Sequence, residues 1–395
     1  MAEPLKTFFS AAIVRKLAGD LERVYPRFPA PRFIAGATAG LDGLELLDRA
    51  KLIAASLARH LPPAYPEAID VLLRSLGPEH ATDELVGVGM APFFYLPHVF
   101  FVAENGLDHF DVSMRAQYQL TKRFSAEFSI RHFLLRDPER TLATLSVWTR
   151  DDNAHVRRLA SEGTRLRLPW AIRVPWLDRN PDRVLGLLEL LKDDRATLVR
   201  RSVANNLNDL GKIHPALLVA TCAAWLQQAS SERRALVEHA LRSAVKRGEP
   251  GALALLGFGG KAAVALEDVR FRPRRAHIGD SVVVSFTLRS QARGPQALLV
   301  DLAVHFVKAG GRTSRKVFKL RKIDLAARAR AALTTKISLA VHTTRKPRPG
   351  RHVVDVLVNG TEFHAGAFDV VAAPSKRVKG RTQAKTPSKK KRSRV

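Results

Sequence analysis

The strongest indication of the architecture is the stretch Val156-Arg157-Arg158-Leu159-Ala160-Ser161-Glu162-Gly163, because close variants of it occur twice more in the chain. Thr121-Lys122-Arg123-Phe124-Ser125-Ala126-Glu127 precedes it, and Val199-Arg200-Arg201-Ser202-Val203-Ala204-Asn205-Asn206 follows it. The acid or amide that ends each copy lies 35 residues (127 to 162) and then 43 residues (162 to 205) from the next. Repetition at such a period is typical of stacked helical repeats of the HEAT or armadillo kind. Equivalent positions in such a stack line up, which predicts a ladder of Arg and Lys side chains with acids set among them.

The first two thirds of the chain show the apolar spacing of helices, from Met1 to about Ala262, with breaks where proline and glycine cluster. Asp137-Pro138-Glu139 and Asn180-Pro181-Asp182 both indicate a helix start, with a capping residue followed by proline at the first helical position. Their separation is again 43 residues (137 to 180). We therefore predict antiparallel helices of about 10–15 residues, paired into repeats.

The pattern changes near residue 260. From Val264 onward the apolar residues alternate, most clearly over 282–288 and 298–306, which is the period of a strand. Gly310-Gly311 and Asn359-Gly360 are predicted hairpin turns. About seven short strands over roughly 110 residues predict an antiparallel β-sandwich of immunoglobulin type.

The predicted organisation is therefore a multidomain chain, α then β. A HEAT-like helical repeat domain covers residues 1–262, an immunoglobulin-like β-sandwich covers 263–372, and a disordered Lys/Arg-rich tail covers 373–395. The single cysteine, Cys222, can form neither an internal disulfide nor a zinc cluster and is read as a buried core residue. We find no signal peptide and no apolar run of membrane-spanning length, so a cytoplasmic location is expected.

The charge of the chain points to a polyanionic partner. The net charge is +28, and the segment from Ser375 to Val395 holds ten basic residues and no acid, which leaves +18 on the rest. Such a surplus indicates nucleic acid or an anionic membrane surface. One Arg pair on a helix is usually just solvated, but this pair recurs at a structural period, which favours phosphate binding. The predicted DNA contacts are Lys122, Arg123, His155, Arg157, Arg158, Arg165, Arg200 and Arg201.

Acids within a cationic surface need an explanation, because a carboxylate in a phosphate groove repels the ligand. Glu127 and Glu162 fall at matching positions of the repeat, and Asp209 lies one turn beyond Asn205. Pairing with neighbouring arginines is one explanation and stays open for each acid. Three acids together favour a cationic target, and the indole of Trp170 is suited to face a delocalised cation. An inter-repeat spacer remains the alternative for Trp170 and is preferred for Trp148. No metal-ligand spacing or phosphate loop is found, so neither a metal nor a cofactor is expected.

These residues carry a family resemblance. The runs 148–165, 168–171, 202–209 and 233–237 resemble the AlkC branch of the bacterial DNA alkylation repair glycosylases, some of which carry a C-terminal sandwich. The resemblance implies a HEAT-like repeat enzyme that cups duplex DNA, with the immunoglobulin-like domain closing around it. A single solenoid that wraps DNA favours a monomer. It implies removal of cationic alkylated bases such as 3-methyladenine and 3-methylcytosine, without a deep base-flipping pocket. By motif position, Glu127, Glu162 and Asp209 resemble the active-site acids, Trp170 the aromatic partner and Arg158 a DNA contact. Leu166 stands where the family usually has proline.

The chemistry of that reaction agrees with the acids. A cationic base is a good leaving group without protonation, and positive charge moves to the sugar as the glycosidic bond breaks. We expect Asp209 and Glu162 to stabilise that charge, Glu127 to support them and Trp170 to face the cation. The main alternative is a non-catalytic HEAT-repeat protein that binds nucleic acid, which has no use for acids in the groove. A protein-interaction solenoid is disfavoured, because it would present an apolar or acidic face.

Overall fold

The computed structural model describes residues 4–84, 89–342 and 346–372. The chain divides into two compact units, Met1–Leu256 and Gly257–Val395, which are described separately below. The division lies a few residues before the 262–263 boundary expected from the change in apolar spacing. The last helix ends at Leu255, Gly257 has a left-handed φ of 85°, and the first strand begins at Val264. The basic tail predicted to be disordered lies outside the described residues.

The first unit is built from helices, as predicted, and its described residues form fifteen α-helices with three short 3-10 helices. The α-helices are α1 (Ala11–Val24), α2 (Ala30–Thr38), α3 (Leu46–His60), α4 (Tyr65–Arg74), α5 (Leu96–Asn105), α6 (Phe110–Thr121), α7 (Ile130–Arg136), α8 (Pro138–Trp148), α9 (Ala154–Glu162), α10 (Pro175–Arg179), α11 (Pro181–Leu191), α12 (Thr197–Leu210), α13 (Pro215–Leu226), α14 (Ser231–Arg247) and α15 (Pro250–Leu255). The 3-10 helices are η1 (Leu5–Phe8), η2 (Leu41–Gly43) and η3 (Ala91–Tyr95).

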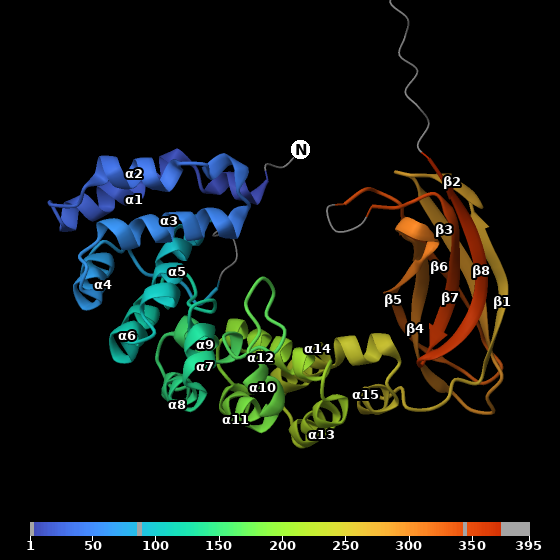
Figure 1. Cartoon of the computed structure of the whole chain (residues 1–395). Helices are drawn as coiled ribbons and strands as arrows, with labels where there is room; N and C mark the ends of the chain where they lie inside the picture. The colour runs from blue at the N-terminus through green and yellow to red at the C-terminus, as the bar shows by residue number, and fades with distance from the viewer. Residues whose placement is uncertain (1–3, 85–88, 343–345, 373–395) are drawn as a thin grey trace, which may run out of the picture. The chain divides into compact units, whose positions relative to one another are not determined.

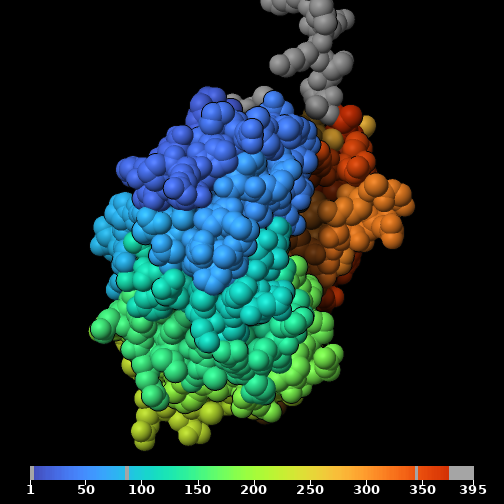
Figure 2. Space-filling model, turned by 60° about the vertical axis from the view of Figure 1, so that its left-hand side comes forward, coloured from blue at the N-terminus to red at the C-terminus, as the bar shows by residue number. Residues whose placement is uncertain are grey.

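The helices of this unit stack in the order of the sequence (Figures 1 and 2). Helix α12 packs between α9 and α14, while α11 packs against both α9 and α12. Leu159 of α9, Val203 of α12 and Val237 of α14 are fully buried and belong to one continuous apolar core. The repeats therefore share a core, as expected for supersecondary units that cannot bury their apolar faces alone. No helix of the described residues is long and apolar enough to cross a membrane.

The 43-residue repeat is visible in side-chain contacts. Asp151 and Asp194 each accept a hydrogen bond from the backbone amide two residues further on, at 2.8 Å in both cases. Arg157 and Arg200, one turn into the helices that follow, each donate to the two carbonyls five and six residues before them. Each loop is thus fastened to its own helix by the first arginine of the Arg pair.

Two details of the repeat differ from prediction. The first copy, Thr121–Glu127, is not a helix: α6 ends at Thr121 and α7 begins at Ile130, so Glu127 lies in the turn between them. Helices α8 and α11 do begin at the predicted prolines, and Asp137 caps α8 by accepting from the amide of Arg140 (3.2 Å). Asn180 does not cap α11, because its Nδ2 donates backward to the carbonyl of Trp176 (2.7 Å).

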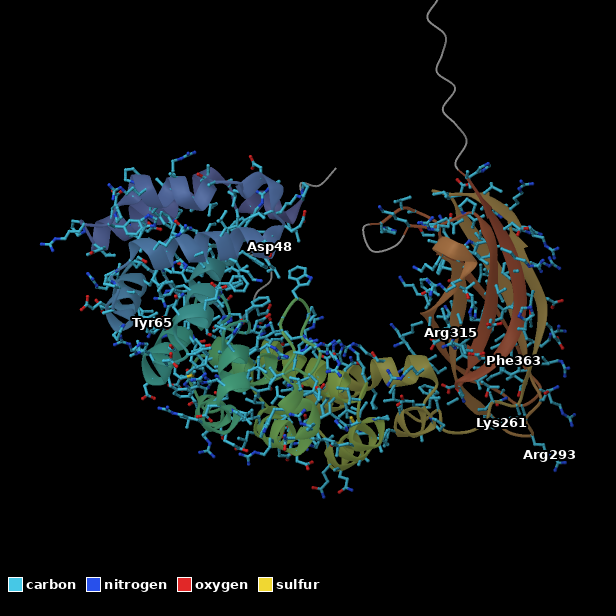
Figure 3. The ribbon with its side chains drawn as sticks, in the orientation of Figure 1. Asp48, Tyr65, Lys261, Arg293, Arg315 and Phe363 are labelled. Carbon is cyan, nitrogen blue, oxygen red and sulfur yellow. The ribbon has the colours of Figure 1, made fainter. Side chains whose placement is uncertain are left out.

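The second unit is a two-sheet β-sandwich with eight strands in its described residues, one more than the roughly seven predicted. They are β1 (Val264–Arg272), β2 (Arg275–His277), β3 (Ser281–Ser290), β4 (Gln296–Val307), β5 (Thr313–Leu325), β6 (Arg330–Ser338), β7 (Gly350–Val358) and β8 (Thr361–Val371). The sheets have the orders β1-β3-β6 and β2-β8-β7-β4-β5. Arg315 of β5 and Phe363 of β8 both belong to the five-stranded sheet (Figure 3).

The turn chemistry predicted both hairpins correctly. Ala309–Gly311 joins β4 to β5, and Asn359-Gly360 joins β7 to β8 with φ of 48° and 79°, the left-handed pair that a two-residue hairpin turn requires. The sandwich is antiparallel as predicted, except at one edge, where the short β2 pairs in parallel with β8. Three residues are too few to show alternation, which is why the sequence did not indicate β2.

Candidate active site

A pocket of about 370 Å³ lies in the helical unit, and it brings together most of the residues predicted to act on the substrate. One wall is apolar and largely aromatic, another is charged, and the loop between α9 and α10 supplies a third. The lining residues are Gly89, Pro92, Phe93, Phe124, Ser125, Glu127, Phe128, Arg158, Glu162, Arg165, Leu168, Pro169 and Trp170. A cation would meet aromatic faces and carboxylates there, which is the environment that stabilises a delocalised positive charge.

Three segments of the chain position these groups. Arg158 and Glu162 lie one turn apart on α9, whose first turn is capped by Asn153 accepting from the amides of His155 and Val156 (2.9 and 3.3 Å). Glu127 comes from the turn between α6 and α7, where Ser125 donates to it (2.8 Å). The loop after α9 contributes Arg165 and Trp170 and projects from the neighbouring helices (Figure 1).

The charged groups form a chain of alternating sign. Arg158 donates to Glu127 at 3.2 Å and lies 3.6 Å from Glu162. Arg165 in turn bonds Glu162 at 2.7 Å and Asp209 at 2.8 Å. Lys212 completes the chain with a 2.7 Å contact to Asp209. The three acids predicted from the sequence are therefore brought together, and each one pairs with a basic side chain.

Glu162 is held in its ionised form. Burial raises the pKa of its carboxyl, but the charges of Arg158 and Arg165, together with a 2.6 Å hydrogen bond from Ser202, outweigh burial and leave the pKa below its usual value. The same pairs act on the arginines: burial lowers the pKa of Arg158, and the charges of Glu162 and Glu127 raise it above its usual value. Glu162 is thus a permanent negative charge on the pocket wall at neutral pH.

Asp209 occupies a different position from the two glutamates. Asp209 lies on α12, and its side chain is 1% exposed and does not line the pocket. The side chains of Arg165 and Lys212 cover its carboxylate through ion pairs. A substrate would reach Asp209 only if one of these basic groups moved. The sequence alone gave no means of telling the covered acid from the accessible ones.

The two candidate tryptophans are in contrasting environments. Trp170 is 62% exposed at the pocket and adopts a left-handed backbone conformation with φ of 64°. Trp148 instead packs against the apolar core, with its ring 5.9 Å from that of Tyr118. The preferred interpretation of Trp148 as a spacer agrees with this contact, and Trp170 has the exposure that a substrate contact needs.

Two predicted DNA contacts lie inside the unit instead of on its surface. Arg157 forms a buried bidentate ion pair with Asp194, at 2.6 and 2.9 Å, and its remaining nitrogen bonds carbonyls. His155 is buried, its Nε2 is 2.9 Å from the carbonyl oxygen of Thr82, and its ring lies 4.4 Å from that of His80. Both side chains are buried and occupied by these internal contacts, so neither lies on the surface where a phosphate would bind.

The remaining predicted contacts are more accessible. Arg201 is exposed and lines a second pocket of about 520 Å³ between the first turns of α12 and α14. Arg200 lines the same pocket while fastening its own loop. Lys122 and Arg123 are half-buried beside Glu79, at 2.8 and 3.7 Å. Within the described ranges, no group of three or more His, Cys, Asp or Glu side chains is arranged to hold a metal ion.

Several residues of the pocket were not predicted. Phe93 and Phe124, whose rings lie 5.1 Å apart, and Phe128 line it, while the buried Ser202 does not line the pocket but donates a hydrogen bond to Glu162. Phe124 stands within the first repeat copy, which was a usable signal, because an aromatic residue directly after the basic pair departs from the Leu159 and Ser202 found at that position in the other copies. Phe93 comes from a segment far away in the sequence, and no local pattern indicates that contact.

Both units of the chain are similar to known proteins. Residues 123–247 match the family model of the DNA alkylation repair enzymes, and residues 265–372 match the C-terminal Ig-like domain of the uncharacterised protein YhaZ. YhaZ of Bacillus subtilis (strain 168) is 34% identical over 359 residues, which are 90% of this chain and 96% of YhaZ. The solved structure of the alkylpurine DNA glycosylase AlkC of Pseudomonas fluorescens, bound to DNA containing an abasic site analog, is similar with a TM-score of 0.86 and 38% identity. That match covers 94% of this chain and all of the other.

A helical repeat unit followed by an immunoglobulin-like unit, with both family models in place, defines a DNA alkylation repair enzyme. Within that class the chain belongs to the AlkC-type DNA glycosylases, as the resemblance in its sequence indicated.

Proposed function

We propose that this glycosylase binds duplex DNA, as a monomer in the cytoplasm, and hydrolyses the N-glycosidic bond of cationic alkylated bases such as 3-methyladenine and 3-methylcytosine. The observation that carries the proposal is the placement of ionised Glu162 and of Glu127 on the same pocket as the exposed Trp170. The AlkC structure bound to DNA containing an abasic site analog supports DNA as the partner.

The proposed catalysis is electrostatic. As the bond to a cationic base breaks, positive charge spreads onto the sugar, and a carboxylate about 4 Å away stabilises it by roughly 4 kcal/mol at an effective dielectric of 20. If this interaction is gained mainly in the transition state, the rate rises about a thousandfold. Glu162 is the accessible ionised group for this role, Glu127 supports it, and the same carboxylates can orient the attacking water. A neutral base is a poorer leaving group and gains too little.

The alternating charges explain how acids are tolerated beside phosphates. Three acids and three basic residues alternate along one series of ion pairs, in the order Glu127, Arg158, Glu162, Arg165, Asp209 and Lys212. The pocket wall is therefore close to neutral, and DNA backbone can approach it. We propose that Arg158, Arg165 and Arg201 contact phosphates, since all three face a pocket.

Asp209 is proposed to act when DNA draws Arg165 or Lys212 toward a phosphate. Its carboxylate is then uncovered beside Glu162, with which it shares Arg165. The two acids expected to stabilise the charge on the sugar, Asp209 and Glu162, would then belong to one connected group. The rival function, a non-catalytic DNA-binding protein, would keep the same ion pairs purely as structure.

The test uses duplex DNA treated with a methylating agent and detects released bases by mass spectrometry. We expect wild-type protein to release 3-methyladenine or 3-methylcytosine, and the double variant Asp209→Asn, Glu162→Gln to lose at least about a hundredfold in single-turnover rate. Glu139→Gln, which removes an exposed acid of α8 paired with Arg183, is the control and keeps full activity. Tight binding of the methylated DNA by wild-type protein without any free base would make the protein a binder instead of an enzyme.

A further inference from the structure

Arg131 has no part in the pocket wall, yet among the described residues it is the largest side chain that is fully buried. It lies on α7, 1% exposed, and among the described residues it forms no ion pair. Its guanidinium instead donates to three backbone carbonyls: Nε to Ile172 at 2.7 Å, and Nη1 to Gly163 and Arg165 at 2.9 and 2.8 Å. Burial and the charge of Arg173 lower the pKa of Arg131 to about 10, so it remains a cation at neutral pH.

The three carbonyls belong to the two ends of one loop. Gly163 and Arg165 open the segment that follows α9, and Ile172 closes it before α10. Arg131 therefore ties the start of the loop to its end through a single guanidinium. A loop closed in this way behaves as a compact unit whose ends cannot separate without breaking charge-assisted hydrogen bonds.

This loop carries the groups that face the candidate substrate. Arg165 bridges Glu162 and Asp209, and Trp170 stands at the pocket with a left-handed backbone. A bulky residue with positive φ is held there only when its surroundings over-determine the conformation. Trp170 is 62% exposed and has little packing of its own, so the fixed ends of the loop must supply that constraint.

Gly163 shows how closely the loop is fitted to α7. A Cβ atom there would lie 2.6 Å from Cγ2 of Ile130, the neighbour of Arg131 on α7, so the loop leaves α9 in direct contact with the helix that holds it. The backbone carbonyls thus reach Arg131 because the residue at the exit has no side chain.

We propose that Arg131 is a positioning residue for base excision, which sets the places of Trp170 and Arg165 across the pocket by fixing both ends of their loop. The proposal rests on the proposed function. It predicts that loss of the Arg131 contacts changes the conformation of the loop and slows bond cleavage. Most of the DNA-binding surface should be unaffected by that loss. A displacement of about 1 Å in a substrate-positioning group is enough to lower a rate about a hundredfold.

The chain offers a matched control. Arg49 of α3 is also buried, 6% exposed, and also donates to three backbone carbonyls, those of Leu44, Phe9 and Asp42 at 3.0, 3.0 and 3.1 Å. None of these residues lines the pocket. Arg49→Met and Arg131→Met therefore remove the same kind of interaction from two places, only one of which holds the pocket loop.

The experiment compares wild type, Arg131→Met, Arg131→Lys and Arg49→Met, all as full-length proteins. Amide hydrogen exchange is followed for residues 163–174, single-turnover excision is measured on methylated duplex DNA, and affinity is measured for duplex DNA with an abasic site analog. We expect Arg131→Met to exchange faster in this loop, to lose about a hundredfold in excision and to change affinity less than about threefold. Arg131→Lys keeps the charge and should show a smaller loss of both loop protection and rate, and Arg49→Met should show neither.

Equal losses of excision in Arg131→Met and Arg49→Met would overturn the proposal, because a general loss of stability would then explain both. Unchanged exchange at 163–174 in the Arg131 variants would overturn it too. If Arg131→Met does not fold, Arg131→Lys decides by the same two readouts. If wild-type protein releases no base, the proposed function fails, whereas the exchange comparison still shows whether Arg131 holds the loop.

Discussion

The two arginines of each repeat motif have different tasks, although the sequence presents them as a pair. The first of each pair, Arg157 or Arg200, bonds the carbonyls of the loop before its own helix. The second, Arg158 or Arg201, points to a pocket. Successive side chains on a helix diverge by about 100°, so the two arginines of a pair meet different surroundings, although Arg200 also lines the pocket that Arg201 faces. The motif is specific because it combines a structural arginine with a binding one.

This division predicts that substituting a first arginine mainly lowers stability, whereas substituting a second arginine mainly weakens DNA binding. Arg157→Met leaves Asp194 buried without its partner and should lower the free energy of unfolding by about 3 kcal/mol, with little effect on DNA affinity of the folded protein. Arg201→Met should leave stability within about 0.5 kcal/mol and lower the slope of log K against log salt by about 0.9. Urea unfolding and DNA titrations at several salt concentrations measure both. A change of salt slope in Arg157→Met would contradict the assignment.

The environment of His98 predicts how the free energy of unfolding depends on pH. His98 of α5 is 1% exposed, and burial lowers the pKa of its imidazole from 6.5 to about 4, with Asp20 and Lys16 as the charged groups that act on it. Between these values the unfolded chain binds a proton that the folded protein does not, so stability present above pH 6.5 is lost as the pH falls. From about pH 7 to about pH 5, wild type should lose about 2 kcal/mol more than His98→Gln in urea unfolding. Parallel losses in the two proteins would show that His98 is not the titrating group.

At the scale of helices and loops, sequence patterns correctly predicted those features that depend only on interactions between residues close together in the sequence. The prolines at 138 and 181 begin α8 and α11, and the Asn359-Gly360 turn forms the predicted hairpin, because these depend on a few adjacent dihedral angles. The copy ending at Glu127 looked helical by analogy with α9, yet it is a turn. Glu127 still reaches Arg158, through packing of α6 and α7 that no local pattern contains. The aromatic wall and the Arg131 contacts were missed for the same reason.

The start of α9 gives a prediction at this scale. Asn153 accepts from two amides of the first turn, whereas the side chain of its neighbour Asp152 is exposed. Asn153→Ala should therefore cost about 1 kcal/mol in unfolding free energy, the usual value of a lost N-cap. Asp152→Ala, the control, should stay within about 0.5 kcal/mol. Because α9 carries Arg158 and Glu162, the capping variant should also slow excision if the first turn frays; equal stability of the two variants would show that the cap is dispensable.

At the scale of the whole molecule, the spacing of apolar residues predicted two folded units, because helices and strands each have a characteristic spacing. The composition of the last residues predicted a basic extension. What they could not predict is the chain of charges that links Glu127, Arg158, Glu162, Arg165 and Asp209. Its members lie on four segments of the helical unit, namely the turn before α7, α9, the loop after α9 and α12, and only their packing brings them within ion-pair distance. The candidate acids were identified by motif, but their order along this chain, with Asp209 covered, needed the structure.

The last prediction concerns the charge outside the folded units. The ten basic residues after Pro374 lie beyond the described part of the chain, yet their charge alone makes contact with DNA phosphates hard to avoid. Removing residues 375–395 should reduce the salt slope of DNA binding and slow association at low salt, because each phosphate neutralised contributes about 0.9 to that slope. Excision at saturating protein should stay within about twofold of wild type, since the proposed catalytic acids and Trp170 lie between residues 127 and 209, far from the tail in the sequence. A length-matched tail with glutamine at all ten basic positions is the control that separates charge from chain length, and it should behave like the deletion. Loss of turnover at saturating protein in either variant would mean that the tail takes part in catalysis itself.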